Sequence, residues 1–324
     1  MNAVKIDKPK IEHYVTLFDR LFLPQGLALY ASMERHITDY VLWILCVDDD
    51  THDVLAKINP PNVRLLQLSQ LETDDLLRVK TTRTKREYCW TLTPFAPRFV
   101  FEANPTVTRV TYLDADLWFR KSPAPIFREF QASGKHVLIT DHAYAPDNDA
   151  NATSGQYCVQ FMIFKRNDGE VVRKWWEDHC IEWCYARLEE GKFGDQKYLD
   201  DWPERFFNSV HVLNNKELAL APWNATRFPY GNGVFWHFHS LRIENYSKST
   251  FAVYFGPYTL PRVTIKYVYA SYVAELSKAV EILLKNGFFI QPQQRRSFVT
   301  KIRSNAGVIY RKLRELFPVK RIPL

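Results

Sequence analysis

Long apolar segments are missing from this sequence of 324 residues. No stretch reaches the roughly 18 apolar residues expected of a membrane-spanning helix. The start, Met1–Glu12, is polar and charged and lacks the apolar centre of a secretory signal. Glycine is scarce and no internal repeat is visible. These absences predict a cytoplasmic globular chain, long enough for one large α/β domain or two smaller domains.

Cysteine is also rare. The five cysteines have no CxxC spacing: Cys46, Cys89, Cys158, Cys180 and Cys184. An odd, unpaired set of this kind is typical of free thiols in a reducing compartment. A zinc site at His179, Cys180 and Cys184 is a weaker alternative, because no fourth ligand is evident.

Net positive charge is confined to the C-terminal segment. The net charge is +7, but Gln291–Leu324 alone carries nine Lys and Arg residues against Glu315. Nucleic-acid enzymes usually spread such charge over their working face, so no nucleic acid is expected as substrate. The chain therefore divides into a catalytic domain, residues 1–270, and a basic, amphipathic, helical tail, residues 271–324.

The tail has three interpretations. It is a helix pair packed on the domain, or a basic surface for an anionic membrane, or, least favoured, an RNA-binding segment. Apolar residues such as Ile302 and Leu313 interleave with Arg and Lys, which suits a membrane surface. On that interpretation the protein is peripheral at the inner face of the membrane.

The first 120 residues alternate between strand and helix patterns. Apolar runs predict strands at His13–Phe18, Val41–Val47, Val63–Leu68 and Arg109–Leu113. Helices are expected at Pro24–His36, from a cap at Thr51 to Ile58, and at Arg86–Phe101 with a break near Pro94 and Pro97. This order predicts a doubly wound, mostly parallel sheet that binds ligands beyond the carboxyl ends of its strands.

The rest of the chain continues this pattern less regularly. Strands are expected at Val137–Thr140, Tyr157–Phe164, Val210–Leu213 and Phe235–His239, with helices at Gly169–Glu190 and Asp195–Asp201. Between two of these strands, Asp141–Gln156 is a long polar loop. It is either a mobile connection or an acceptor loop or lid.

An acidic pair follows the fourth strand. Asp114 and Asp116 come directly after the apolar run Val-Thr-Tyr-Leu. Two carboxylates at this spacing can converge on Mn²⁺ or Mg²⁺, which in turn binds diphosphate oxygens. A solvated turn is the alternative for such a common pattern.

Two further motifs carry polar side chains. In the segment Phe235–His239, a strand would direct His237 and His239 to one face, where either imidazole can complete a metal site. After Gly194, Asp195 and Gln196 open a short helix. They either complement the helix dipole or bind sugar hydroxyls.

In combination these motifs resemble the GT-A glycosyltransferases, specifically the retaining family-8-type enzymes that use nucleotide-diphospho-sugars. The matching segments are, in order, Thr16–Asp19, Tyr112–Asp116, Asp195–Gln196 and His237–Phe238. Their order and approximate separations agree over residues 11–243. The resemblance implies a GT-A (Rossmann-like), mostly parallel mixed sheet flanked by helices.

The resemblance also implies roles for residues. Asp114 and Asp116 would hold the metal together with His237, with His239 as the alternative, and Asp114 would also lie near the ribose. Thr16 and Asp19 would lie by the nucleotide base, and Gln196 and Asp195 at the reacting sugar. Arg242 would replace the family's phosphate-binding Lys, since Ser240 and Leu241 depart from the family's motif.

The implied reaction transfers a hexose from a UDP-sugar to a hydroxyl of a glycan or glycolipid acceptor, with retention at the anomeric carbon. Such chemistry is typical of polysaccharide biosynthesis. Two alternatives remain. One is a phosphatase of the haloacid dehalogenase type, in which the first Asp is the nucleophile. The other is a non-catalytic protein that binds nucleotide-sugars.

Overall fold

A central sheet of seven strands organises the chain, in the order β3-β2-β1-β4-β7-β6-β8. The computed structural model describes residues 11–229, 231–246, 250–290 and 320–323. The strands are β1 (Glu12–Phe18), β2 (Tyr40–Cys46), β3 (Val63–Gln67), β4 (Arg109–Leu113), β6 (Val137–Asp141), β7 (Tyr157–Lys165) and β8 (Val210–Val212). Neighbouring strands pair in parallel, except that β7 runs antiparallel to β4 and β6. The predicted mostly parallel mixed sheet is confirmed.

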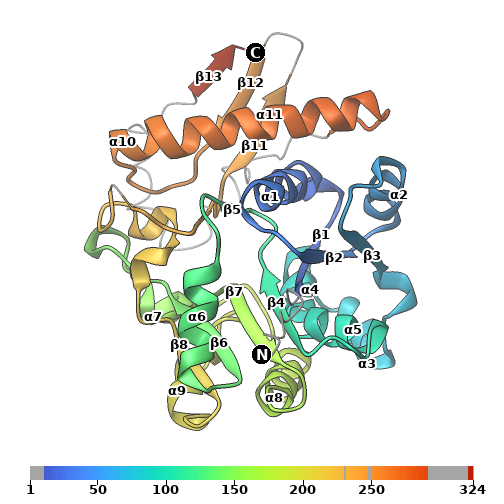
Figure 1. Ribbon diagram of the computed structural model, residues 1–324, viewed down its shortest axis with the longest axis vertical. Helices are drawn as coiled ribbons and strands as arrows, with labels where there is room; N and C mark the ends of the chain where they lie inside the picture. The colour runs from blue at the N-terminus through green and yellow to red at the C-terminus, as the bar shows by residue number, and fades with distance from the viewer. Residues whose placement is uncertain (1–10, 230, 247–249, 291–319, 324) are drawn as a thin grey trace, which may run out of the picture.

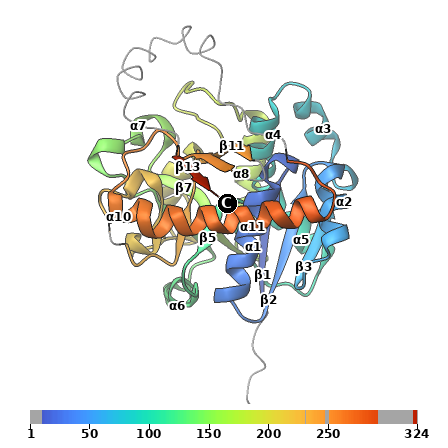
Figure 2. The same cartoon turned by 90° about the horizontal axis from the view of Figure 1, so that it is seen from above.

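Side-chain alternation along the strands divides the core into two layers. On β1, Tyr14 and Phe18 join one cluster of buried side chains, whereas Val15 and Leu17 join another. The first cluster includes α1 (Leu23–His36) and α11 (Ala270–Lys285), and the second includes α3 (Asp74–Lys80), α4 (Lys85–Leu92), α5 (Phe95–Ala103) and α8 (Glu170–Glu182). Figures 1 and 2 show these helices flanking the sheet. The other helices are α2 (Asp49–Ile58), α6 (Ala124–Ser133), α7 (Asn151–Ser154), α9 (Trp202–Arg205) and α10 (Arg262–Thr264).

A small second sheet, in the order β5-β10-β9, joins two distant parts of the sequence. Its strands are β5 (Leu117–Phe119), β9 (Ala219–Leu220) and β10 (Phe235–His237). The antiparallel pairing of β10 with β5 sets His237 opposite Leu117, and so next to Asp116. A third sheet contains β11 (Arg242–Tyr246), β12 (Thr250–Tyr254) and β13 (Lys320–Pro323).

Helix α11 packs into the main core. Its Tyr272 is fully buried and stacks on Phe238, with ring centroids 3.5 Å apart. Its Glu275 forms an ion pair of 2.5 Å with Arg35 of α1, and Figure 1 shows the two helices side by side. The helical pattern expected for the tail, residues 271–324, is thus present as far as Lys285. Residues 291–319 of the basic tail lie outside the described residues.

Several predicted boundaries were wrong for identifiable reasons. Helix α2 begins at Asp49 because Asp48, not Thr51, is its N-cap and accepts a hydrogen bond from the Thr51 amide. Helix α8 ends at Glu182 rather than Glu190, since Trp183 is extended and Arg83 donates to the Ile181 carbonyl near the helix end. A break near Pro94 does separate α4 from α5, as predicted.

The strand predicted at Phe235–His239 is shorter than expected. It ends at His237, and Ser240 has a positive φ of 66°. The Phe238 amide donates instead to the Asp116 carbonyl, at 2.9 Å. The argument that His237 and His239 share one face of a strand therefore fails.

Candidate functional site

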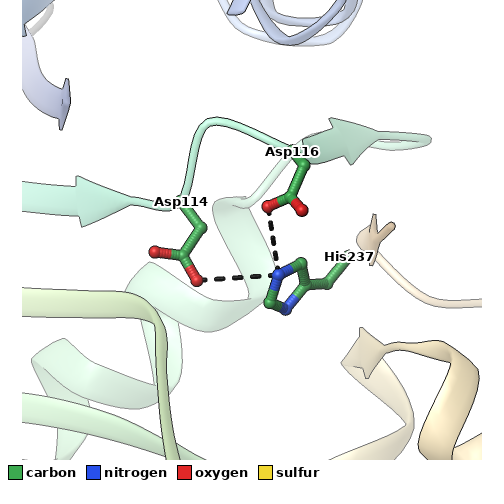
Figure 3. A group of neighbouring side chains, drawn as sticks. All are labelled: Asp114, Asp116 and His237. Atoms are coloured by element: carbon green, nitrogen blue, oxygen red, sulfur yellow. Dashed lines mark ion pairs between the residues drawn. The ribbon is translucent and has the colours of Figure 1, made fainter. Parts of the chain in front are cut away.

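Two carboxylates from the turn between β4 and β5 and one imidazole from β10 converge on one point (Figure 3). The Nε2 atom of His237 lies 3.1 Å from a carboxylate oxygen of Asp116 and 3.6 Å from one of Asp114. Metal ions in proteins are usually held by His, Cys, Asp or Glu. Among the described residues, this is the one group of three or more of these residue types whose ligand atoms lie within 4.8 Å of one another. His237 is buried, whereas both carboxylates keep partial exposure. The group is thus open to a ligand on its carboxylate side.

The strand ends position the two carboxylates. The Asp114 amide donates to the Gln160 carbonyl of β7 at 3.0 Å, and the Leu117 amide donates back to the Asp114 carbonyl at 3.2 Å. These bonds form a tight turn between β4 and β5. The Tyr112 hydroxyl donates to the Asp114 carboxylate at 3.0 Å. Strand β4 therefore fixes the position of the acidic pair, and its Tyr112 also donates a hydrogen bond to the Asp114 carboxylate.

Gln160 orients the histidine, and no motif in the sequence had indicated this residue. Its Oε1 lies 3.0 Å from Nδ1 of His237, and its Nε2 donates to the Thr140 hydroxyl. An amide oxygen only accepts, so Nδ1 of His237 carries a proton and Nε2 faces the carboxylates. The one available signal was a buried polar residue inside the apolar run Tyr157–Phe164.

This geometry requires a positive species between the three side chains. A neutral His237 would direct the Nε2 lone pair at two carboxylates, which is repulsive. Although burial alone favours the neutral ring, the nearby Asp116 holds the pKa of His237 well above its ordinary value. Either a proton or a divalent cation satisfies the arrangement, and two carboxylates with one imidazole are ligands that suit Mn²⁺ or Mg²⁺. The residues present fit a metal ion.

The two carboxylates have different environments. Burial raises the pKa of Asp114 to about 6, and the like charge of Asp116 adds to this effect while His237 opposes it. For Asp116 burial also acts upward, but His237 outweighs it and the pKa falls below its usual value. Ionisation is thus easier for Asp116 than for Asp114.

His239 lies outside the group of three described above. Its ring is exposed, and its Nδ1 lies 2.7 Å from the Tyr258 hydroxyl. The indole of Trp223 contacts both histidines edge-on, with centroids 5.2 Å from His237 and 5.6 Å from His239. The structure thus brings His237, and not His239, to the two carboxylates.

Asp195 is buried near the same carboxylates. Its side chain is 3% exposed, and its Oδ2 has no hydrogen-bond partner among the described residues. Burial raises the pKa of Asp195 to about 8, and the charge of Asp114 adds to the shift although Thr93 opposes it. This raised pKa favours the protonated form of the Asp195 carboxyl near neutral pH. The neighbouring Gln196 donates from Nε2 to the Ser154 carbonyl at 2.9 Å.

The residues expected near the nucleotide lie at the carboxyl end of β1. Asp19 accepts from the Leu21 amide and forms an ion pair of 2.8 Å with Lys85, which also reaches Asp48. The structure thus brings a lysine from the start of α4 to Asp19. Thr16 is fully buried in β1, and its hydroxyl has no partner among the described residues.

Arg242 lies near the group formed by Asp114, Asp116 and His237. Its positive charge helps to lower the pKa of Asp116, behind the larger effect of His237. The guanidinium centre is 5.5 Å from the Phe22 ring centroid, and one nitrogen donates to the Leu241 carbonyl. A cation at this position would suit a phosphate group that also touched a metal ion held by the two carboxylates.

Comparison with known proteins identifies relatives over most of the chain. No protein-family model matches it. It is 35% identical over 249 residues to a Bacillus subtilis (strain 168) protein described as uncharacterized protein YfnF, covering 71% of this chain and 82% of YfnF. It is 27% identical over 284 residues to uncharacterized protein YfnD of the same organism, covering 83% of this chain and 90% of YfnD.

Among solved structures, the galactosyltransferase LgtC in complex with donor and acceptor sugar analogues has a TM-score of 0.50 at 11% identity, covering 82% of this chain and 95% of LgtC. Mouse xyloside xylosyltransferase 1 has a TM-score of 0.47 at 14% identity, covering 72% of this chain and 99% of the xylosyltransferase chain. At this identity the similarity to LgtC concerns the fold alone, and it confirms the expected GT-A architecture.

Proposed function

Because the chain belongs to the family of YfnF of Bacillus subtilis and has the GT-A fold, we propose that it is a metal-dependent glycosyltransferase. The proposed reaction transfers a hexose from a nucleoside-diphosphate sugar, most simply a UDP-sugar, to an acceptor hydroxyl. The observation that carries this proposal is the convergence of Asp114, Asp116 and His237 at the carboxyl edge of a mostly parallel sheet.

These three residues would hold Mn²⁺ or Mg²⁺. When bound, the ion neutralises charge that develops on the departing diphosphate. Arg242 binds the same diphosphate from the β11 side, and the end of β1 at Asp19 receives the nucleoside. A fixed cation beside a fixed carboxylate pair stabilises the leaving group without reorganisation during the reaction.

The residues at the sugar are Gln196 and Asp195. We assign the reaction as retaining, in line with the resemblance to family-8-type enzymes. Gln196 offers its amide oxygen to the reacting face, since its NH₂ group is engaged by Ser154. The protonated Asp195 donates a hydrogen bond rather than acting as a base.

A screen for nucleotide release tests this function. Purified protein is incubated with UDP-glucose, UDP-galactose, UDP-N-acetylglucosamine or GDP-mannose, with Mn²⁺ or with a chelator. We expect metal-dependent release of nucleotide from at least one donor, abolished in Asp116→Ala. Phosphate release from a sugar phosphate would favour the phosphatase alternative, and donor binding without turnover would favour the non-catalytic one.

For the acceptor we propose a glycan or glycolipid at an anionic membrane surface. In the described residues no helix has the length and apolar character to cross a bilayer. The outward side of α10 to α11 exposes four cations and one acidic residue: Arg262, Lys266, Lys278, Lys285 and Glu281. Sedimentation with anionic liposomes, with and without residues 291–324, tests this. No sedimentation of the full 324-residue chain would remove the membrane from the proposal, and equal sedimentation of both forms would assign the membrane contact to α10 and α11 rather than to residues 291–324.

A further inference from the structure

The polar loop Asp141–Gln156 is closed firmly at its base. The His142 amide donates to the Gln156 carbonyl at 2.9 Å, so the two ends of the loop meet. The Asp141 carboxylate accepts from the Ala143 amide and from Lys216, each at 2.6 Å. The loop is therefore held where it leaves β6 and returns to β7.

The loop is also fixed to a second segment, the 3₁₀ helix η4 (Lys197–Asp201). One carboxylate makes the central contact, because Asp200 Oδ1 accepts from the Gln156 amide at 2.7 Å. Its other oxygen pairs with Lys197 at 2.8 Å, and Lys197 also donates to the Asn151 carbonyl at 3.2 Å. Asp200 and Lys197 thus bridge the loop and η4.

A glycine makes this close approach feasible. Gly155 has a φ of +94°, a conformation that side chains disfavour. A Cβ placed there would lie 2.8 Å from the Asp200 carboxylate oxygen. The backbone before Gln156 is therefore shaped to receive the Asp200 carboxylate.

The same contact region includes Gln196. Its Nε2 donates to the Ser154 carbonyl of the loop. A carbonyl only accepts, so the NH₂ side of the amide faces the loop and Oε1 is turned away from it. Since Asp200 holds the turn that presents this carbonyl, it acts on Gln196 through the loop.

We propose that Asp200 is a positioning residue for Gln196, and that the 141–156 loop is a fixed wall of the reaction site rather than a mobile lid. This inference rests on the proposed glycosyltransferase function. Asp200 itself does not touch the donor. Releasing it leaves nucleotide and metal binding intact, but misplaces the amide, and small misplacements of reacting groups cost up to about 100-fold in rate.

The test compares Asp200→Ala and Asp200→Asn with Asp201→Ala. Asp201 is the adjacent residue, and its carboxylate pairs instead with Arg205. Three quantities are measured: hydrogen exchange of the loop amides, affinity for UDP with Mn²⁺, and kcat for hydrolysis of the UDP-sugar that the donor screen identifies. Melting temperatures show whether each variant is folded.

We expect Asp200→Ala to accelerate exchange of the loop amides and to lower kcat by roughly 10- to 100-fold, with UDP affinity within about 2-fold of wild type. Asp200→Asn keeps an oxygen for the Gln156 amide, so we expect a smaller loss of kcat. If the alanine variant does not fold, the comparison is made with Asp200→Asn instead. Asp201→Ala should change neither the exchange of the loop amides nor kcat.

Unchanged exchange in Asp200→Ala would overturn the proposal, as would faster exchange with unchanged kcat, or an equal loss of kcat in Asp201→Ala. A wild-type protein that neither binds UDP with Mn²⁺ nor turns over a donor would instead overturn the proposed function. In that case the exchange data would still report whether Asp200 fixes the loop.

Discussion

The Oε1 atom of Gln160 lies 3.0 Å from Nδ1 of His237, and this contact determines which ring nitrogen is available at the site. The same residue accepts the Asp114 amide through its own carbonyl. Gln160 therefore holds two of the three candidate metal ligands from one position on β7. Mutation of a residue that orients a metal ligand in this way usually lowers metal affinity by about 10- to 100-fold.

Gln160→Leu removes the acceptor for His237 Nδ1 and frees the ring to rotate. We expect Mn²⁺ affinity, measured by calorimetry, to fall by about 10- to 100-fold. Gln160→Glu keeps an oxygen at Nδ1 and should retain most of the affinity. Gln131→Leu, an exposed change on α6, is the matched control. Equal affinities in wild type and Gln160→Leu would show that this contact does not support the site.

Metal binding should weaken in acid. Burial holds the pKa of Asp114 at about 6, and Asp116 holds that of His237 well above its ordinary value. A cation must displace these protons, so affinity rises as pH increases through about 6 and beyond. Titrations of Mn²⁺ at pH 5.5, 6.5 and 7.5 measure the effect. An affinity independent of pH would mean that the ion binds elsewhere.

Asp195 gives a stability prediction with the opposite dependence on pH. Burial raises the pKa of Asp195 from 3.8 to about 8 in the native state. Between these values the native protein binds more protons than the unfolded chain, so stability falls as pH rises, with a limiting slope of about 1.4 kcal/mol per pH unit.

Asp195→Asn removes this ionisation while keeping the side-chain shape. In urea unfolding with a chelator, the stability difference between variant and wild type should shift in favour of the variant from pH 5 to pH 8. Parallel stability curves for the two proteins would contradict the assigned environment of Asp195.

Helix α11 should be essential to the stability of the fold. Tyr272 is fully buried and stacked on Phe238, which directly follows His237. Tyr272→Ala should lower the free energy of unfolding by about 3–5 kcal/mol, as for other large aromatic deletions. The exposed Lys278→Ala is the control on the same helix. A loss below about 1 kcal/mol would mean that α11 is only loosely attached.

The sequence predicted that Asp114 and Asp116 lie together at an edge of the sheet, because the apolar strand before them had to end there. It predicted the positions of the first four strands along the chain, because each is a short apolar run. It did not separate His237 from His239, since the end of β10 depends on the hydrogen bond from Phe238 to Asp116 and on the turn at Ser240. Gln160 escaped notice because its role arises only when β7 pairs beside β4.

Helix α8 shows the other limit of sequence patterns. Its helical periodicity continues past Glu182, but the chain turns there because Trp183 packs into the core and Tyr185 accepts from the Gly194 amide. These contacts join residues that a local pattern treats separately. They also determine the approach of the chain to Asp195 and Gln196.

The central claim is that Asp114, Asp116 and His237 hold a divalent ion that binds a nucleoside diphosphate. Calorimetric titration of UDP into the protein, with Mn²⁺ or with a chelator, tests it most directly. We predict that UDP binds wild type only when Mn²⁺ is present, and that Asp116→Asn loses this binding while staying folded. UDP binding of equal strength without metal, or in Asp116→Asn, would contradict the assignment.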